Sequence, residues 1–375
     1  MSKKEYSIRD YNPGDEEEIV ELLQLSFDGW PHFDIDCSPL EHWRWKYQEN
    51  PVGRSLINIA ECERRIIGAR QSYLQRIRIG DKVFRSMYAG DLVVHPDYRR
   101  MGISNEMTER ARRSLKKNGI NFTYFVTGNP FLIKSFEKRW SKVPHLVQNL
   151  VRIRDIDWQL REMPIKNAWM MKIGFSGAKF LNDVRRKLVS TGSRHSDVRI
   201  TRFNSFDDRF DEFWDQISPQ YNYIVERSRE YLNWRYCDPR AGDFVLHVAE
   251  EDDKVKGYCV LRINRYRKEY PVGFIVDLLA LSEKDDVVNT LASNACDYFD
   301  GEDVNIVNYQ VIQNHPYGKI LKNHGFLDSR IRLHLFCYPF EIKDDFSRIK
   351  EIPANEAYFS YGDIDTLPVD LPIER

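Results

Sequence analysis

Hydrophobic and polar residues follow nearly the same order in two distant parts of the chain. Residues 6–11 alternate as a short strand, and after a Pro-Gly turn Ile19, Leu22, Leu23 and Leu25 stand at helical spacing. Residues 198–204 and 207–217 repeat this strand and helix pattern. Each half of the chain is therefore predicted to begin with a strand followed by an amphipathic helix.

The repetition continues through residues that are individually uncommon. Aligning Ile8 with Ile200 gives an offset of 200 − 8 = 192 positions, and later landmarks give 189 and then 186. A slowly falling offset is what short loop deletions produce, so we predict one unit of about 187 residues used twice. The landmark pairs are residues 45–47 (WKY) with 234–236 (WRY), 59–61 (IAE) with 248–250 (VAE), 91–93 (DLV) with 277–279 (DLL), and 129–131 (NPF) with 315–317 (HPY).

These offsets predict four segments along the chain. Residues 1–155 and 196–345 form the two repeated domains, residues 156–195 link them, and residues 346–375 are a C-terminal tail. Within the linker, residues 165–192 interleave apolar side chains with Lys and Arg. We read this stretch as an amphipathic helix packed on a domain, with a helix lying on a membrane as the alternative.

Composition limits the classes of partner. The chain has 57 acidic and 56 basic side chains, a net charge of −1, whereas nucleic acid or an anionic membrane favours an excess of Lys and Arg. The six cysteines have neither the spacing of zinc ligands nor that of a disulfide framework. No signal-peptide pattern and no run of ~18 uncharged apolar residues is present. We expect a soluble cytoplasmic protein with no metal, no nucleic-acid partner and no membrane span.

The stretch from residue 89 to residue 104 (AGDLVVHPDYRRMGIS) carries the clearest chemistry. It is a β-rich run followed by a turn, a short basic loop and the start of a helix predicted over 105–117. A helix N-terminus offers unpaired N–H groups and a partial positive charge, so it can hold a phosphate. Arg99 and Arg100 add cations, and Gly102 lets the backbone approach an anion. The pattern predicts a pyrophosphate-binding loop, with a solvated turn as the alternative.

The same string resembles motif A of the GCN5-related N-acetyltransferase (GNAT) superfamily, Val-x-Pro-x-Tyr-Arg-x-x-Gly-x-(Gly/Ala). Val94, Pro96, Tyr98, Arg99 and Gly102 match it, with Ser104 at the last small position. The resemblance implies that acyl-CoA, most simply acetyl-CoA, is the co-substrate. Backbone N–H groups at Leu92 and Val94 would hold the pantetheine arm and polarise the thioester carbonyl. The remaining residues implied to contact CoA in this stretch are Val93, Arg100, Met101 and Ile103.

The resemblance also implies a fold class. Each half is expected to be a GNAT-like α/β (α+β) domain, in which a mostly antiparallel mixed sheet is flanked by helices, and the two domains stand in tandem. At the 186 offset, Arg99 and Arg100 correspond to Asp285 and Asp286. Two carboxylates would repel a pyrophosphate, so the second domain is expected to be degenerate and not to bind CoA in the usual way.

Further residues are implied downstream of the loop. Asn129 matches the asparagine of the family's Asn-x6-Tyr motif and would contact acyl-CoA, but Phe136 stands at the tyrosine position and cannot donate a proton. A thiol of pKa about 8.5 still leaves tolerably well as a thiolate. Tyr88, Asp91 and Tyr124 are the candidates for moving protons. A structural role is an equally good reading of Asp91, because Asp277 repeats it.

These features predict an acyl-CoA-dependent N-acyltransferase that moves an acetyl group to an amine by direct attack. The acceptor is expected to be an amino sugar, a small amine or a peptide, and Trp30 or Phe33 would contact it unless both belong to the core. Two alternatives stay open. One is a non-catalytic acyl-CoA-binding or interaction protein, and the other is a transferase that takes an aminoacyl group from charged tRNA, which the near-zero net charge disfavours.

Overall fold

The computed structural model contains two compact units whose segments interleave along the chain. It describes residues 5–31, 33–138, 140–162, 198–281, 285–340 and 348–364. Unit 1 consists of residues 1–144, 223–242 and 334–352, and unit 2 of residues 145–222, 243–333 and 353–375. The predicted linker helix over 165–192 lies outside the described residues, as do residues 365–375 of the predicted tail.

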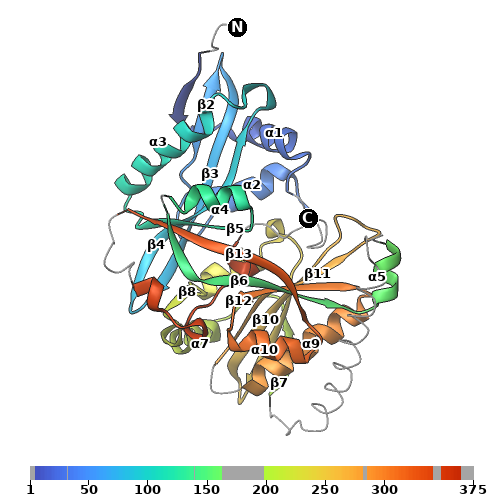
Figure 1. The fold of residues 1–375 in the computed structure, drawn as a ribbon. Helices are drawn as coiled ribbons and strands as arrows, with labels where there is room; N and C mark the ends of the chain where they lie inside the picture. Colours follow the sequence, from blue (N-terminus) through green and yellow to red (C-terminus); the bar gives the residue numbers. More distant parts are fainter. Residues whose placement is uncertain are drawn as a thin grey trace. The chain divides into compact units, whose positions relative to one another are not determined.

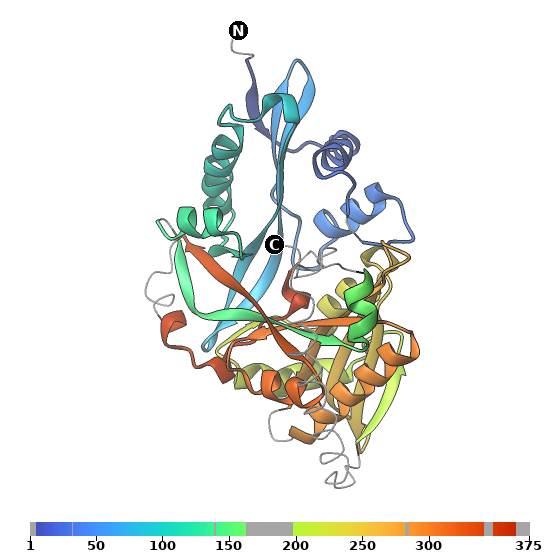
Figure 2. The same ribbon diagram turned by 45° about the vertical axis from the view of Figure 1, so that its right-hand side comes forward.

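Unit 1 is a mixed sheet with helices on both faces (Figures 1 and 2). Its neighbouring strands pair antiparallel except for β4 and β5, which are parallel, and the C-terminal part of β13 closes the sheet beside β5. The short β8 pairs with the end of β3. The strands are β1 (Ser7–Asp10), β2 (Asn58–Cys62), β3 (Arg65–Ile79), β4 (Lys82–Val94), β5 (Phe122–Thr127), β8 (Tyr223–Val225) and β13 (Leu327–Pro339).

The helices of unit 1 lie on opposite faces of this sheet. Figure 2 shows α3 and α4 on one face and α1 and α2 on the other. Helix α2 begins after a capping box, in which Ser38 accepts the N–H of Glu41 and the Glu41 carboxylate accepts the N–H of Ser38. The helices are α1 (Glu16–Phe27), α2 (Pro39–Tyr47), α3 (Ile103–Lys117), α4 (Pro130–Phe136) and α8 (Arg229–Tyr236).

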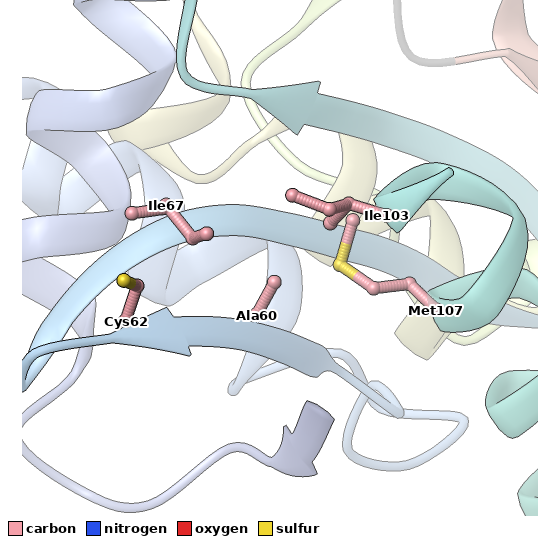
Figure 3. Close-up of a cluster of buried hydrophobic side chains, with 5 residues drawn as sticks. All are labelled: Ala60, Cys62, Ile67, Ile103 and Met107. Atoms are coloured by element: carbon pink, nitrogen blue, oxygen red, sulfur yellow. The ribbon is translucent and has the colours of Figure 1, made fainter. Parts of the chain in front are cut away.

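An apolar cluster fixes α3 against β2 and β3. Ile103 and Met107 of α3 meet Ala60, Cys62 and Ile67 of the strands, and all five side chains are buried (Figure 3). Residues three or four apart on a helix share a face, which is why a helix whose other positions are mostly polar buries this pair. The cluster therefore sets the place where α3 begins relative to the end of β4.

After β6 and α5, unit 2 repeats the element order and pairing senses of unit 1, except that the counterpart of α2 is α8, which belongs to unit 1. Strands β7, β9, β10 and β11 pair antiparallel in turn, β11 and β12 are parallel, and residues 147–153 of β6 close the sheet antiparallel to β12. The strands are β6 (Ser141–Ile153), β7 (Arg199–Phe203), β9 (Val245–Glu251), β10 (Lys254–Asn264), β11 (Val272–Ala280) and β12 (Ile306–Ile312). The helices are α5 (Ile156–Glu162), α7 (Arg209–Ile217), α9 (Asp285–Gly301) and α10 (Pro316–Asn323).

The mostly antiparallel mixed sheets flanked by helices confirm the predicted fold class. Within the described chain, the last strand of each predicted repeat does not pair beside its own predecessors. Strand β6 contributes residues 147–153 to unit 2, and β13 contributes residues 334–339 to unit 1. Sequence periodicity identifies strands but not their neighbours, so this exchange was not predicted.

Candidate active site

The sheet of unit 1 opens between its two parallel strands. The pairing of β4 with β5 ends where Tyr88 lies beside Tyr124. Just beyond, β4 carries a bulge. Ala89 pairs with Ser72 and Leu92 pairs with Arg70, so β4 has two residues between these pairs where β3 has one. Residues 89–92 are partly or fully exposed although residues 86–88 and Val93 on either side of them are buried, and Leu92 is 42% exposed. An accessible stretch in the middle of a sheet marks an opening.

Two backbone amides of β4 point into this opening. The His95 N–H donates to the carbonyl of Ile67 on β3, at 2.8 Å. Because successive N–H groups of a strand point to alternate sides, those of Val94 and Leu92 point away from β3, toward β5. Neither amide has a side-chain acceptor in the described chain. Both are therefore available to a ligand in the opening.

The loop after β4 leads from this opening to the start of α3. A 3₁₀ turn (η1, Pro96–Tyr98) comes first, Arg100 and Gly102 then adopt left-handed conformations with φ of 68° and 86°, and α3 starts at Ile103. The Asn105 and Glu106 N–H groups bond to the carbonyl of Gly102, at 3.0 and 3.2 Å. The N–H groups one turn earlier have no such partner in an α-helix. They remain available for an anion.

The loop arginines surround this helix start. Arg99 and Arg100 are both exposed. Arg99 Nε donates to the carbonyl of Val94 at 3.2 Å. That carbonyl points to the same side of β4 as the Val94 N–H, so the Arg99 guanidinium lies on the side of the opening. A Cβ at Gly102 would meet nothing within 4 Å, which leaves room above the backbone.

Asp91 sits on the β4 bulge and accepts three hydrogen bonds from the α1–α2 side. The donors are Tyr47 OH at 2.6 Å, Lys46 Nζ at 3.1 Å and Trp30 Nε1 at 3.2 Å. Burial raises the pKa of this carboxyl, but the Lys46 ammonium and these hydrogen bonds outweigh burial and hold its pKa below the ordinary value. Asp91 is therefore an ionised carboxylate beside the opening, its side chain 11% exposed.

The two candidate tyrosines are buried beneath the opening. Tyr88 is 4% and Tyr124 0% exposed, and their rings meet edge to face at 5.2 Å. The Tyr124 hydroxyl donates to the Gln75 side-chain carbonyl, and Gln75 Nε2 donates to Tyr231 OH at 2.8 Å. The Tyr124 proton is thus already engaged within the protein.

The downstream motif residues have structural contacts. The Asn129 side chain caps α4 by accepting the N–H groups of Phe131 and Leu132, at 2.9 and 3.4 Å. Phe136 packs edge to face against Phe125 at 5.6 Å. Neither contact tests a role in binding acyl-CoA.

The aromatic residues proposed to meet the acceptor are largely buried. Trp30 is 8% and Phe33 9% exposed, and both contact the His42 ring edge to face. His42 Nδ1 donates to the Arg240 carbonyl at 2.7 Å. The aromatic cluster therefore supports α2 and, through Trp30, the Asp91 carboxylate.

Unit 2 closes the corresponding opening with its own side chains. The Leu281 N–H donates to Lys256 on β10, so the amides of Leu278 and Ala280 point toward β12, as those of Leu92 and Val94 point toward β5. Here Tyr358 OH accepts from the Leu278 N–H and Tyr317 OH from the Ala280 N–H, both at 3.1 Å.

The connection after β11 is also shorter than the loop after β4. Strand β11 ends at Ala280 and α9 begins at Asp285, whereas β4 ends at Val94 and α3 begins at Ile103, and every residue of β11 is buried. Asp277 corresponds to Asp91 and accepts hydrogen bonds from Tyr358, Tyr258 and Ser360, at 2.6, 3.1 and 3.1 Å. The equivalent place in unit 2 is filled by protein.

The sequence marks Lys46 and Tyr47 as repeat landmarks within an aromatic-rich segment expected on the acceptor side, but it does not predict their contact with Asp91, and it does not single out Tyr358. The pattern WKY, repeated as WRY, carried a signal for a lysine near the site, but nothing in it names Asp91 as its partner. Among the described residues, no three His, Cys, Asp or Glu side chains gather as a metal site. Likewise, no described helix is long and apolar enough to cross a membrane.

An opened β4–β5 pair beside a basic loop at a helix N-terminus is the arrangement expected from the resemblance to GNAT domains. Residues 7–136 match the model of the acetyltransferase (GNAT) domain family. A comparison of the sequence with curated proteins gave no significant match.

Three solved structures are similar to the whole chain. A probable N-acyltransferase from Enterococcus faecalis V583 has a TM-score of 0.60 and 10% identity, covering 90% of this chain and 74% of its own. A GCN5-related N-acetyltransferase from Anabaena variabilis has a TM-score of 0.61 and 10% identity, covering 95% and 85%. Saccharomyces cerevisiae N-myristoyltransferase, solved with myristoyl-CoA and inhibitors, has a TM-score of 0.58 and 11% identity, covering 90% and 82%. At these identities the likeness establishes the fold.

Proposed function

We propose that unit 1 is the catalytic unit of an N-acyltransferase that uses acyl-CoA, most simply acetyl-CoA, to acylate an amine. The supporting observation is that the Leu92 and Val94 amides point into an accessible opening that leads to a basic helix start. This combination provides donors for a thioester and an anion site for a pyrophosphate within one continuous stretch of chain.

The proposed binding mode follows the chain from the loop into the opening. The N–H groups from Met101 to Ser104, with Arg99 and Arg100, hold the pyrophosphate. The pantetheine arm runs along β4 past Val93, and the thioester carbonyl accepts the N–H of Leu92 or Val94. We retain Asn129 and Phe136 as contacts of the pantetheine arm from the β5 side.

The reaction we propose is direct attack. The lone pair of a neutral amine adds to the thioester carbon, negative charge develops on the carbonyl oxygen, and the β4 amides stabilise it. The C–S bond then breaks, CoA leaves as a thiolate, and the amide nitrogen loses its extra proton to water. With a leaving thiol of pKa about 8.5, a protein acid is not required at this step.

Among the three catalytic candidates, Asp91 has the clearest role. A carboxyl whose pKa is held below its ordinary value is a weak base, so we propose that Asp91 attracts and orients the acceptor amine rather than deprotonating it. Tyr88 and Tyr124 lie beneath the opening, and we retain them as groups that shape its floor and as reserve proton donors.

For unit 2 we propose a degenerate copy of the same domain with no CoA site. Its matching element order supports the common origin, and the Tyr358 and Tyr317 hydroxyls on the equivalent amides support the loss of binding. One chain should then bind one acyl-CoA. The six free cysteines fit the cytoplasmic location that we also propose.

Titration with acetyl-CoA tests the assignment. Wild type should bind one equivalent, whereas Gly102→Asp, which places a carboxylate at the pyrophosphate, and the Arg99→Ala/Arg100→Ala pair should bind at least tenfold more weakly. The matched control is Arg64→Ala/Arg65→Ala, which removes two exposed arginines, one in the turn after β2 and one at the start of β3. Equal binding by all four proteins would refute the loop assignment.

Catalysis is tested separately by the release of free CoA thiol across a panel of amino sugars, small amines and peptides. Binding without amine-dependent CoA release for any acceptor class would leave a binding protein rather than a transferase.

A further inference from the structure

Among the residues that the structure describes, Arg70 is a buried cation without a carboxylate partner. It lies on β3 directly opposite Leu92, and 7% of its surface is exposed. Within the described chain its side chain makes one hydrogen bond, from Nη1 to Ser72 Oγ at 3.3 Å. A buried guanidinium is normally paired, because an unpaired charge in a protein interior destabilises the fold.

The charged groups around Arg70 belong to other pairs. Asp10 on β1 shares its row across the sheet but accepts Arg110 of α3 at 3.0 and 3.1 Å, and Glu109 accepts Arg112 at 2.5 Å. Burial, and to a lesser extent the positive charge of Arg112, lower the pKa of Arg70 to about 10. The side chain is therefore still a cation at neutral pH, and no carboxylate in the described ranges pairs with it.

The fold itself does not require an arginine at this position. In unit 2 the residue opposite Leu278 is Cys259, which is neutral and fully buried. The strands around it pair as they do around Arg70. The cation thus occurs in the unit whose opening is accessible and is replaced where Tyr358 fills the equivalent place.

Arg70 lies beside the expected thioester rather than beside the phosphate loop. Its hydrogen bond to Ser72, which is buried on β3 and faces Ala89, shows that the guanidinium extends along β3 and away from the pair of Gly68 with Val94, after which the loop begins. Neighbouring strands are about 4.8 Å apart, and the Leu92 N–H points away from β3. A group held on that amide must therefore extend over β4 by roughly this spacing plus a hydrogen-bond length of about 3 Å, and its end need only come within about 3 Å of the guanidinium. A chain of four or five carbons that ends in a carboxylate has this reach.

We propose that Arg70 recognises a carboxylate on one of the two reacting molecules, either at the end of a dicarboxylic acyl chain or on the acceptor. The proposal rests on the proposed function, since it places the thioester at Leu92. It extends that function by naming the substrate feature that the unit selects.

Calorimetry with CoA thioesters in the absence of acceptor tests the first source. Succinyl-CoA and butyryl-CoA have nearly the same length but differ in the terminal carboxylate. Wild type should prefer succinyl- or glutaryl-CoA over butyryl-CoA, and Arg70→Met should reduce that preference by about 30-fold while leaving acetyl-CoA binding unchanged. Arg70→Lys should keep part of the preference. The control Arg76→Met removes another β3 arginine, which is 41% exposed and paired with Glu226. It should change neither the preference for the dicarboxylic thioesters nor the affinity for acetyl-CoA.

Transfer kinetics test the second source. If the carboxylate belongs to the acceptor, Arg70→Met leaves every thioester affinity unchanged but raises KM for an amino acid by about 30-fold relative to its amide. Either pattern supports the proposal. If Arg70→Met weakened the binding of CoA, acetyl-CoA and succinyl-CoA equally, Arg70 would be assigned to a CoA phosphate and the proposal would be overturned. Unchanged thioester affinities together with an unchanged KM would overturn it as well.

Thermal denaturation separates recognition from a purely structural role. Since Arg70 has no carboxylate partner, Arg70→Met and Arg70→Cys should melt at or above the wild-type temperature. A lowered melting temperature together with unchanged ligand preference would overturn the proposal. Failure of the proposed function is distinguishable, because Gly102→Asp would then retain acetyl-CoA binding whatever Arg70 does.

Discussion

Replacing Asp91 by Asn tests the arrangement of the β4 bulge. The substitution keeps the size of the side chain and an oxygen for Tyr47 and Trp30, but it removes the negative charge 3.1 Å from Lys46 Nζ. Lys46, whose side chain is 6% exposed, then loses the carboxylate charge of Asp91 next to its ammonium. The variant therefore isolates the charge of Asp91 from its shape.

The expected decrease in the free energy of unfolding follows from the burial of both Asp91 and Lys46. Removing one member of a buried ion pair costs about 3–5 kcal/mol, and since Asn still accepts hydrogen bonds we expect about 3 kcal/mol for Asp91→Asn. For a unit of this size that lowers the melting temperature by about 6–12 °C. Adding Lys46→Met removes the stranded cation and should recover about 1–2 kcal/mol.

The contribution of Asp91 to stability should decrease at acidic pH. The pKa of Asp91 is lowered in the folded state, so its contribution to the free energy of unfolding is complete above the ordinary value of about 3.9 and is lost as the pH falls through the folded value. In urea denaturation from pH 7 to pH 3, the difference in free energy of unfolding between wild type and Asp91→Asn should stay constant down to about pH 4. Below about pH 4 this difference should decrease.

Two results would refute this reasoning. If Asp91→Asn were as stable as wild type, the pair with Lys46 would contribute nothing. If Lys46→Met added its own loss to that of Asp91→Asn, the two side chains would not be coupled. An acyltransfer rate that fell while the KM for the amine stayed constant would in turn contradict the proposed role of Asp91 in binding the acceptor.

Three further predictions concern other parts of the molecule. Tyr358→Phe should lower the free energy of unfolding by about 2 kcal/mol in urea titrations, because it strands the buried Leu278 amide and an Asp277 acceptor, without changing acetyl-CoA stoichiometry. Gly102→Ala should cost about 1 kcal/mol of stability and less than tenfold in acetyl-CoA affinity, since φ is 86° but a Cβ has open space. Burial lowers the pKa of His315 to about 4, so wild type should lose up to about 3 kcal/mol between pH 6.5 and pH 4 as the unfolded chain takes up the proton, and His315→Asn should flatten this slope in urea series.

Features coded by neighbouring residues could be predicted from the sequence. The turn, the basic loop and the helix start lie within 16 residues, and the helix expected from Asn105 begins at Ile103. Alternation placed Leu92 and Val94 on one strand, and the structure adds which way their amides point. Local chemistry of this kind does not depend on how distant strands pair.

Features coded by distant residues could not be predicted. Lys46 meets Asp91 across 45 positions, and Tyr358 meets Leu278 across 80. The burial of Arg70 could not be predicted either, because an arginine in an alternating strand is ordinarily expected on the solvent side. These contacts depend on strand pairing and on the C-terminal segment, neither of which hydrophobic periodicity specifies.

The split of β13 between the units has a consequence for synthesis on the ribosome. Strand β5 ends at Thr127, but its partner residues 334–339 are made 334 − 127 = 207 positions later. During that interval the growing chain carries an unpaired strand edge, which invites pairing with other chains. Neither unit is one continuous stretch of sequence, so no single cut releases either of them intact. Completion of the proposed catalytic unit is therefore delayed until nearly the whole chain has emerged.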